Sequence, residues 1–441
     1  MRKTYKPLLL LTIFFLVGCS SFQALSAETT TSTPYPATAT LVLPTPFHQL
    51  TNTPTPLVGQ ALQYNCQEVL PSLPDNTSLS GTLVLDNKDT VLFLNLESGK
   101  RHNLDITKLG YGGFLVSPNG EHVAYHQYLK DLSSMSEWLV IADPDGQQEV
   151  KTLLRDDWDG PFWLDNKRMI FSLLERHEDL AGVAVSWIEV KSTIVINPFT
   201  NEQQDLPLNY PGLKDYRGAG GNPFEFFGDS TRVVYDPSLS LAVYFQTDEN
   251  GEQYIALWDR KAGKTLARVK SYPDQPAPMW SPSRKLFYSV GFSAEPQHGK
   301  AFYDWFSIST QGHVQQLTHF DKSLDDAAIE ASSLSPNGRY LAFWLNLAQS
   351  QQDGQQEHLV VLNLDTLETT AYCIPESVAV NRSAPIWSPD SRYIAVTQWL
   401  NDNRQSVLIL NIENKWIAQL AEDLFVKGWM ISVPLSSSAT P

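Results

Sequence analysis

The chain has 441 residues, of which 42% are hydrophobic and 11% aromatic, enough apolar material for a large globular core. Its formal net charge is −16 at pH 7, with 48 acidic and 32 basic residues. This balance argues against nucleic-acid binding and against attachment to anionic lipid by charge, because both need clustered positive side chains.

The first residues have the pattern of a targeting segment. Three basic residues among the first six precede the apolar run Leu8–Val17, which is too short to span a bilayer comfortably. Leu16-Val17-Gly18-Cys19 then matches the cleavage box of bacterial lipoproteins. We therefore expect a lipoprotein signal peptide over residues 1–18 and lipidation of Cys19, with an ordinary secretory peptide or a short membrane anchor as the alternatives. A lipid anchor would place the protein on the extracytoplasmic side of the cell membrane or the outer membrane.

Residues 19–60 are rich in Thr, Pro and Ser, with few charges and no hydrophobic periodicity, which is typical of a disordered tether. A lead-in segment, residues 61–80, follows and contains Cys66. The third cysteine of the chain is Cys373, near the end. Two cysteines left over in an exported domain are candidates for a disulfide, with two separate thiols as the alternative, because spacing alone cannot show proximity.

A hairpin motif recurs six times at intervals of about 50 residues. Its clearest copy is Ala384–Leu400, in which the turn Ser388-Pro389-Asp390-Ser391 separates two apolar runs. Proline presets the turn backbone, and Asp and Ser can hydrogen-bond to it. The other copies are 115–120, 279–284 and 334–338, and two weaker ones without the proline, Phe162–Asn166 and Phe226–Ser230, the last with Val233–Tyr235 as its outgoing strand.

A second hairpin follows each copy, as in residues 255–269 and 359–373. Its first strand is apolar on both faces, which indicates a sheet packed between two neighbours. Two hairpins make a four-stranded blade that cannot bury both faces alone, so blades must stack into a ring. The sequence therefore predicts an all-β protein, a β-propeller.

The two ends of the predicted propeller complement each other. Residues 81–85, 90–96 and 99–104 read as three strands with no Ser-Pro hairpin before them, and Phe425–Val433 reads as one strand with no blade after it. We expect these four strands to form a composite closing blade, which avoids unpaired sheet edges. Six full units and this one make seven blades over residues 81–435, before a tail at 436–441. Six blades remain the alternative.

The repeats resemble those of the TolB-type β-propeller family. Phe306–Gly312, followed by Gln316-Leu317-Thr318, also resembles that family's second hairpin. The resemblance implies protein–protein interaction in the cell envelope. TolB has an additional N-terminal domain and is soluble in the periplasm, whereas this chain has a tether and an expected lipid anchor. We therefore do not assign the partners or the interface residues of TolB to this chain.

The connections between blades and those between second and third strands lie on one face of a propeller, and long insertions fall there in this chain. They suggest an aromatic and acidic rim in which Trp158, Tyr216 and Phe320 are platforms for a ligand. The candidate rim residues are Asp156, Asp157, Trp158, Asp159, Tyr210, Tyr216, Arg217, Phe320 and Asp321.

No catalytic, metal or cofactor site is predicted. The acidic clusters at 156–159 and 321–326 lack the spacing of an ion-binding loop, and the chain has no H-E-x-x-H, C-x-x-C or G-x-S-x-G motif. We expect a lipid-anchored, extracytoplasmic, non-catalytic binding scaffold whose partner is an envelope protein, a peptide or a carbohydrate. The alternatives are an extracellular carbohydrate-active enzyme that uses rim carboxylates at the channel mouth, and a structural envelope protein without a small ligand.

Overall fold

The computed structural model describes residues 62–87, 90–105, 109–129, 137–155, 158–178, 186–213, 233–271, 275–297, 300–322, 324, 327–347, 357–374, 383–400 and 404–432. These residues form strands and turns, with one short 3-10 helix, η2 (Phe320–Lys322). None of the helices within those ranges has the length and apolarity needed to cross a membrane. The expected signal peptide, Cys19 and the tether lie outside the described residues.

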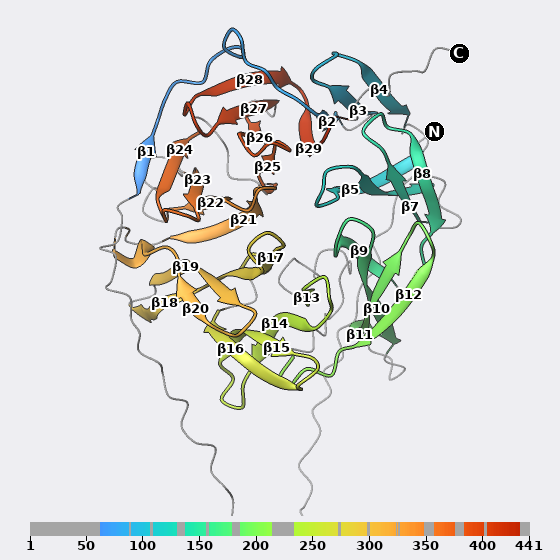
Figure 1. The fold of residues 1–441 in the computed structure, drawn as a ribbon, viewed down its shortest axis with the longest axis vertical. Helices are drawn as coiled ribbons and strands as arrows, with labels where there is room; N and C mark the ends of the chain where they lie inside the picture. Colours follow the sequence, from blue (N-terminus) through green and yellow to red (C-terminus); the bar gives the residue numbers. More distant parts are fainter. Residues whose placement is uncertain are drawn as a thin grey trace, which may run out of the picture. The chain divides into compact units, whose positions relative to one another are not determined.

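Seven sheets are arranged as the blades of a β-propeller, and Figure 1 shows them around a common axis. Blade 1 contains β5 (Leu109–Val116), β6 (Val123–Leu129), β7 (Glu137–Ala142) and β8 (Gln148–Leu153). Blade 2 contains β9 (Trp158–Trp163), β10 (Met169–Glu178), β11 (Ser186–Asn197) and β12 (Glu202–Pro207). Blade 3 contains β13 (Val234–Tyr235), β14 (Leu241–Thr247), β15 (Gln253–Asp259) and β16 (Lys264–Lys270).

Blade 4 contains β17 (Met279–Ser281), β18 (Leu286–Gln297), β19 (Lys300–Ser309) and β20 (Val314–Gln316). Blade 5 contains β21 (Ala328–Leu334), β22 (Tyr340–Asn346), β23 (Glu357–Asn363) and β24 (Thr369–Cys373), with β1 (Gln63–Asn65) added beside β24. Blade 6 contains β25 (Ile386–Trp387), β26 (Tyr393–Trp399), β27 (Gln405–Asn411) and β28 (Ile417–Glu422).

Blade 7 closes the ring from both ends of the propeller. Its strand order is β29 (Phe425–Met430), β2 (Thr82–Asp86), β3 (Thr90–Asn95) and β4 (Arg101–Asp105). β29 pairs antiparallel with β2, with Met430 opposite Thr82 and Phe425 opposite Asp86. The predicted composite blade and the count of seven blades are confirmed.

The third hairpin copy was placed one strand too early. Val234 and Tyr235 form the first strand of blade 3, so they lead into the turn at 236–240 rather than out of one at 226–230. The carboxylate of Asp236 accepts the backbone N–H groups of Ser238 (3.1 Å) and Leu241 (2.6 Å). Asp236 thus supplies the acceptor that serine supplies in other copies, which corrects the prediction. Residues 226–230 lie outside the described ranges.

Neighbouring blades pack face to face, which explains why their middle strands are apolar on both sides. Every residue of β27 is buried, as are six of the seven in β14. Two tryptophans at the end of first strands also bridge blades. The indole N–H of Trp163 donates to the carbonyl of Leu115 (2.8 Å), and that of Trp387 donates to the carbonyl of Ser333 (3.3 Å).

The first and third turns of the blades share one face, here called the turn face. In blade 6 the Ser388 hydroxyl donates to Asp390 (2.6 Å) and accepts the N–H of Tyr393 (2.9 Å). Arg284, from the first turn of blade 4, donates to the carbonyl of Gly338 (2.6 Å) and pairs with Asp365, from the third turn of blade 5. These contacts fix the turns of adjacent blades against one another.

The lead-in segment runs along the outside of the ring before it enters blade 7 (Figure 1). Cys66 and Cys373 form a disulfide with their Cα atoms 4.7 Å apart, which resolves the alternative left open by the sequence. Farther along, the N–H of Leu70 donates to the carbonyl of Ile417, and the carbonyl of Leu70 accepts the N–H of Gln419 (2.9 Å each). The segment therefore contacts the outer strands of blades 5 and 6.

Candidate functional site

The predicted rim is only partly described. Asp156, Asp157, Tyr216 and Arg217 lie outside the described residues, and Asp159 is placed only as part of the backbone of β9. The side chains of Trp158, Tyr210, Phe320 and Asp321 are described. These four come from three separate segments of the chain.

Two of the rim aromatics belong to the core. Tyr210 is 6% exposed, its ring stacks on Tyr244 with centroids 4.9 Å apart, and its hydroxyl donates to that of Tyr235 (3.2 Å). Burial raises the pKa of Tyr210. Phe320 is 3% exposed and packs against Phe343, with ring centroids 6.1 Å apart. Neither ring offers a face to a ligand, which corrects the expectation for these two residues. The connections fold down onto the blades, and their apolar side chains fill the space between them.

Trp158 and Asp321 are half-buried. The ring centroids of Trp158 and Phe171 are 5.3 Å apart, and the Arg155 guanidinium lies 5.6 Å from the centroid of the Trp158 ring. The indole nitrogen of Trp158 and Oδ1 of Asp321 are each buried without a hydrogen-bond partner. No pair of converging carboxylates is built by the rim residues that the structure describes.

The connection that carries Phe320 and Asp321 is held by a buried carboxylate that the sequence analysis did not single out. Asp304 of β19 accepts the Thr318 hydroxyl (2.6 Å) and the N–H of Phe320 (2.8 Å). Burial outweighs these hydrogen bonds and raises the pKa of Asp304. Because its partners all come from its own blade and the following connection, Asp304 positions the loop.

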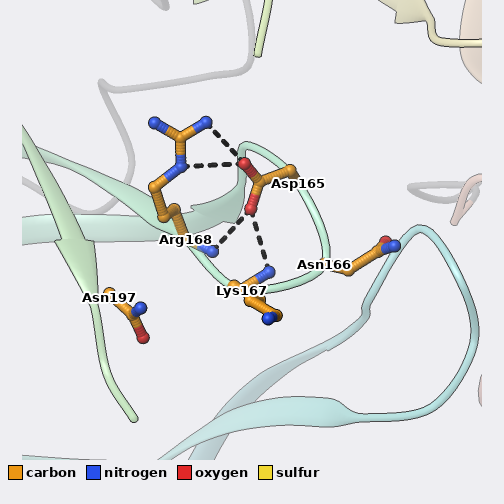
Figure 2. Close-up of a pocket in the computed structure, with 5 residues that line it drawn as sticks. All are labelled: Asp165, Asn166, Lys167, Arg168 and Asn197. Carbon is orange, nitrogen blue, oxygen red and sulfur yellow. Dashed lines mark hydrogen bonds and ion pairs between the residues drawn. The ribbon is translucent and has the colours of Figure 1, made fainter. Parts of the chain in front are cut away.

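The turn face carries an open hollow of about 330 Å³ in blade 2, lined by Asp165, Asn166, Lys167, Arg168 and Asn197 (Figure 2). Oδ1 of Asp165 accepts the N–H groups of Lys167 (2.9 Å) and Arg168 (2.8 Å), and Oδ2 accepts Nε of Arg168 (2.8 Å). Partial burial opposes ionisation of Asp165, but the hydrogen bonds from Arg168 and the two amides outweigh it and lower its pKa.

The Asp165–Arg168 pair also fixes the hollow in the ring. Arg168 donates to the carbonyl of Pro237 (2.5 Å), in the first turn of blade 3. Both charged groups are thus engaged within the protein. Asn166 and Lys167 are exposed at the tip of the turn, where they remain able to contact a ligand.

An aromatic patch adjoins the hollow and is defined here as His122, Trp163 and Phe199. His122 of blade 1 stacks on Trp163 of blade 2 with centroids 6.5 Å apart, and lies 5.1 Å from the ring of Phe199. Phe199 is 38% exposed, in the turn after β11, and its N–H donates to Asn197 of the hollow (3.1 Å). Oε2 of Glu149 lies 3.0 Å from Nδ1 of His122.

The patch and the hollow together offer aromatic faces, two asparagine amides and the exposed ammonium of Lys167 within a small area. Side chains of these kinds contact a ligand by stacking and hydrogen bonding. No group of three or more His, Cys, Asp or Glu side chains in the described part of the chain is placed to hold a metal ion. The exposed ring of Phe199 beside the exposed Asn166 and Lys167 makes the geometry suited to binding. Sequence reasoning missed this surface. The one available signal was Phe199 within the turn-forming run Asn-Pro-Phe-Thr-Asn, which is typical of an aromatic side chain at the surface.

No family model matches the chain, and no curated protein matches it. Solved structures with a similar arrangement include TolB from Acinetobacter baumannii, with 13% identity, a TM-score of 0.38, and coverage of 77% of this chain and 79% of that one. An oligogalacturonate lyase from Vibrio parahaemolyticus has 10% identity and a TM-score of 0.47, with 78% and 87% covered. The Swd1 β-propeller domain from Myceliophteria thermophila has 11% identity and a TM-score of 0.44, with 79% and 99% covered. At these scores the likenesses carry no argument about function.

Proposed function

We propose that this protein is a lipid-anchored, extracytoplasmic β-propeller that acts as a non-catalytic binding scaffold for a partner protein of the cell envelope. The observation that carries the binding role is the aromatic patch beside the polar hollow. An exposed ring in a turn, packed against His122, which itself stacks on Trp163, is a suitable central contact for a protein partner, because aromatic side chains dominate interface energetics.

The proposed location rests on two features that support each other. The motif ending at Cys19 is a lipoprotein cleavage box, and the Cys66–Cys373 disulfide is of a kind that persists in oxidising compartments outside the cytoplasm. Cys19→Ser should release the protein from membranes into the soluble fraction. Unchanged membrane fractionation of this variant would contradict the anchor.

The binding role is tested with Phe199→Ala and Lys167→Ala in the full-length chain. Removing a central aromatic contact typically costs about 1 kcal/mol or more of binding free energy. The amount of partner protein that Phe199→Ala captures should therefore be about tenfold lower than the amount that the wild type captures. Val314→Ala is the matched control, because Val314 is an apolar side chain 42% exposed on blade 4. Equal capture by the wild type, Phe199→Ala and Val314→Ala would place binding elsewhere.

The carbohydrate-active alternative requires two converging carboxylates at the rim. Asp156 and Asp157 lie outside the described residues, and no observation on the remaining rim favours hydrolysis or elimination. We therefore propose no enzymatic activity.

A further inference from the structure

β1 is an additional strand on one blade. Among the described residues only blade 5 has a fifth strand, and β1 pairs with β24 in parallel over three positions, Gln63 to Thr370 through Asn65 to Tyr372. The side chains of Gln63 and Tyr64 are exposed, so the pairing itself buries little apolar surface. The preceding residue, Leu62, is buried and holds the end of the strand. The disulfide follows the strand directly and is its covalent restraint.

The disulfide is open to reagents in solution. Cys66 is exposed and Cys373 is half-buried. Solvent-accessible disulfides are more often labile or regulatory than those enclosed in a core. Accessibility alone would not distinguish a switch from a permanent cross-link, and a second feature lies beside the bond.

That feature is His358 of β23. It is 3% exposed, and its Nδ1 is buried without a hydrogen-bond partner. His358 lies directly opposite Cys373 in the antiparallel pair of β23 with β24, so the two side chains project on the same face of the sheet. The ring of Tyr64 from β1 approaches that of His358 edge-on, with centroids 5.3 Å apart. β1 therefore contributes to the cover over His358.

A buried ring nitrogen without a partner is unfavourable, and a disulfide sulfur cannot donate a hydrogen bond to it. A cysteine thiol can donate one through its S–H. Reduction of Cys373 would therefore place a thiol donor on the residue directly opposite His358, whose Nδ1 is the acceptor in the Nε2–H tautomer. A hydrogen bond from this thiol to Nδ1 would form only in the reduced protein, so it would favour reduction.

We propose that Cys66–Cys373 is a reversible redox switch, in which His358 favours the dithiol form and reduction releases β1 from the edge of β24. A thiolate of an external dithiol attacks Sγ of the exposed Cys66, and the S–S bond breaks with Cys373 leaving as a thiolate that takes up a proton. The second thiol of the reagent then attacks the mixed disulfide and frees Cys66. Two electrons pass from the dithiol, which becomes a disulfide, to the two cysteines. The product exposes the outer edge of β24 and the ring of His358.

Release of β1 is tested on the full chain with dithiothreitol under native conditions. Hydrogen exchange of the amides in 63–66 and 370–373, and carbethoxylation of His358, should each rise at least tenfold on reduction. Cys66→Ser/Cys373→Ser should show the open pattern with or without the reductant. A disulfide that resists the native-state treatment, or a β1 that stays protected once the bond is broken, would overturn the proposal.

The role of His358 is that of a positioning residue and is tested through the equilibrium constant for reduction by dithiothreitol. His358→Phe, which keeps a ring but loses the acceptor, should lower this constant about tenfold, and His358→Gln should restore part of it. His102→Phe, in blade 7 away from the disulfide, is the control and should leave the constant unchanged. An equal constant in the wild type and His358→Phe would refute the tuning by His358, whereas a purely structural role would change the stability of the protein without this pattern.

Discussion

The inter-blade tryptophans give the sharpest test of how the ring is held together, because two of them occupy the same place in the repeat with opposite hydrogen-bonding states. Trp163 donates to Leu115 of the preceding blade at 2.8 Å, whereas the indole nitrogen of Trp280 is buried without a partner. Both are half-buried at the first turn of their blades. Replacing each with Phe removes the indole N–H and a similar part of the ring.

The two replacements should differ by about 2 kcal/mol. Trp163→Phe loses a hydrogen bond worth about 1 kcal/mol and leaves the carbonyl of Leu115 without its donor. Trp280→Phe instead removes an unsatisfied donor, whose desolvation costs about 1–3 kcal/mol, so this gain offsets much of the lost ring contact. We expect Trp163→Phe to destabilise the fold clearly and Trp280→Phe to be close to neutral.

Chemical denaturation followed by circular dichroism is the suitable assay. With about 2.1 cal/mol/K of unfolding entropy per residue, a domain of this size shifts its Tm by only about 1–2 °C per kcal/mol. The midpoint in urea at an unchanged slope is the more sensitive measure, and a backbone signal is unaffected by the loss of one fluorophore. Equal midpoints for the two variants would refute the assignment of an inter-blade hydrogen bond to Trp163.

Two pairs of substitutions test the turns and the buried acids. Asp165→Asn should be less stable than the wild type near neutral pH, because hydrogen bonds hold the pKa of Asp165 below its ordinary value. The deficit should shrink as the pH falls below that ordinary value and through the lowered pKa, where protonation removes the contribution of Asp165. Asp304→Asn should show the opposite trend in pH-dependent denaturation. Burial raises the pKa of Asp304, so the wild type should lose stability relative to this variant as the pH rises through that pKa. Parallel pH profiles for Asp165→Asn and Asp304→Asn would contradict both assignments. Gly338→Ala should cost more stability than Gly99→Ala, because both glycines have positive φ (+68° and +67°) but only a Cβ at Gly338 meets Ser283 of the neighbouring blade; equal losses would show that the inter-blade approach at Gly338 is unimportant.

The repeat was predictable because a hairpin is local. The turn Ser388–Ser391 and its two flanking strands are decided by residues within one short stretch, so the pattern of Ser, Pro and Asp was sufficient. The position of the third copy was predicted wrongly for the same reason. Its true turn begins with Asp236 instead of serine, while the sequence at 226–235 imitates a turn followed by an apolar strand. Only pairing of Tyr235 with Ala242 shows which apolar run comes first.

The candidate site was not predictable because it is made by two blades. His122 and Phe199 are 77 positions apart by their numbers, and their contact depends on how blade 1 packs on blade 2. The burial of Phe320 depends likewise on Phe343 of the following blade. An aromatic residue in a connecting segment can cap the core or face solvent, and the local sequence does not distinguish the two outcomes. Strand pattern therefore predicts blades, whereas exposure of loop aromatics requires the packing between them.

The closing blade and the lead-in segment address one weakness of a ring made from a linear chain. The ring is closed by backbone pairing of β29 with β2, so separation of these two strands would free the C-terminal end. The disulfide joins residues 307 positions apart and links the N-terminal lead-in to blade 5, while Leu70 holds the same segment to β28 of blade 6. The lead-in segment thus crosses the outer side of blade 6 and enters blade 7, and its attachment does not depend on the β29–β2 pair. Because a pull on residue 62 reaches Cys66 before it reaches β2, the force passes to blade 5, and the strand pair that closes the ring is spared.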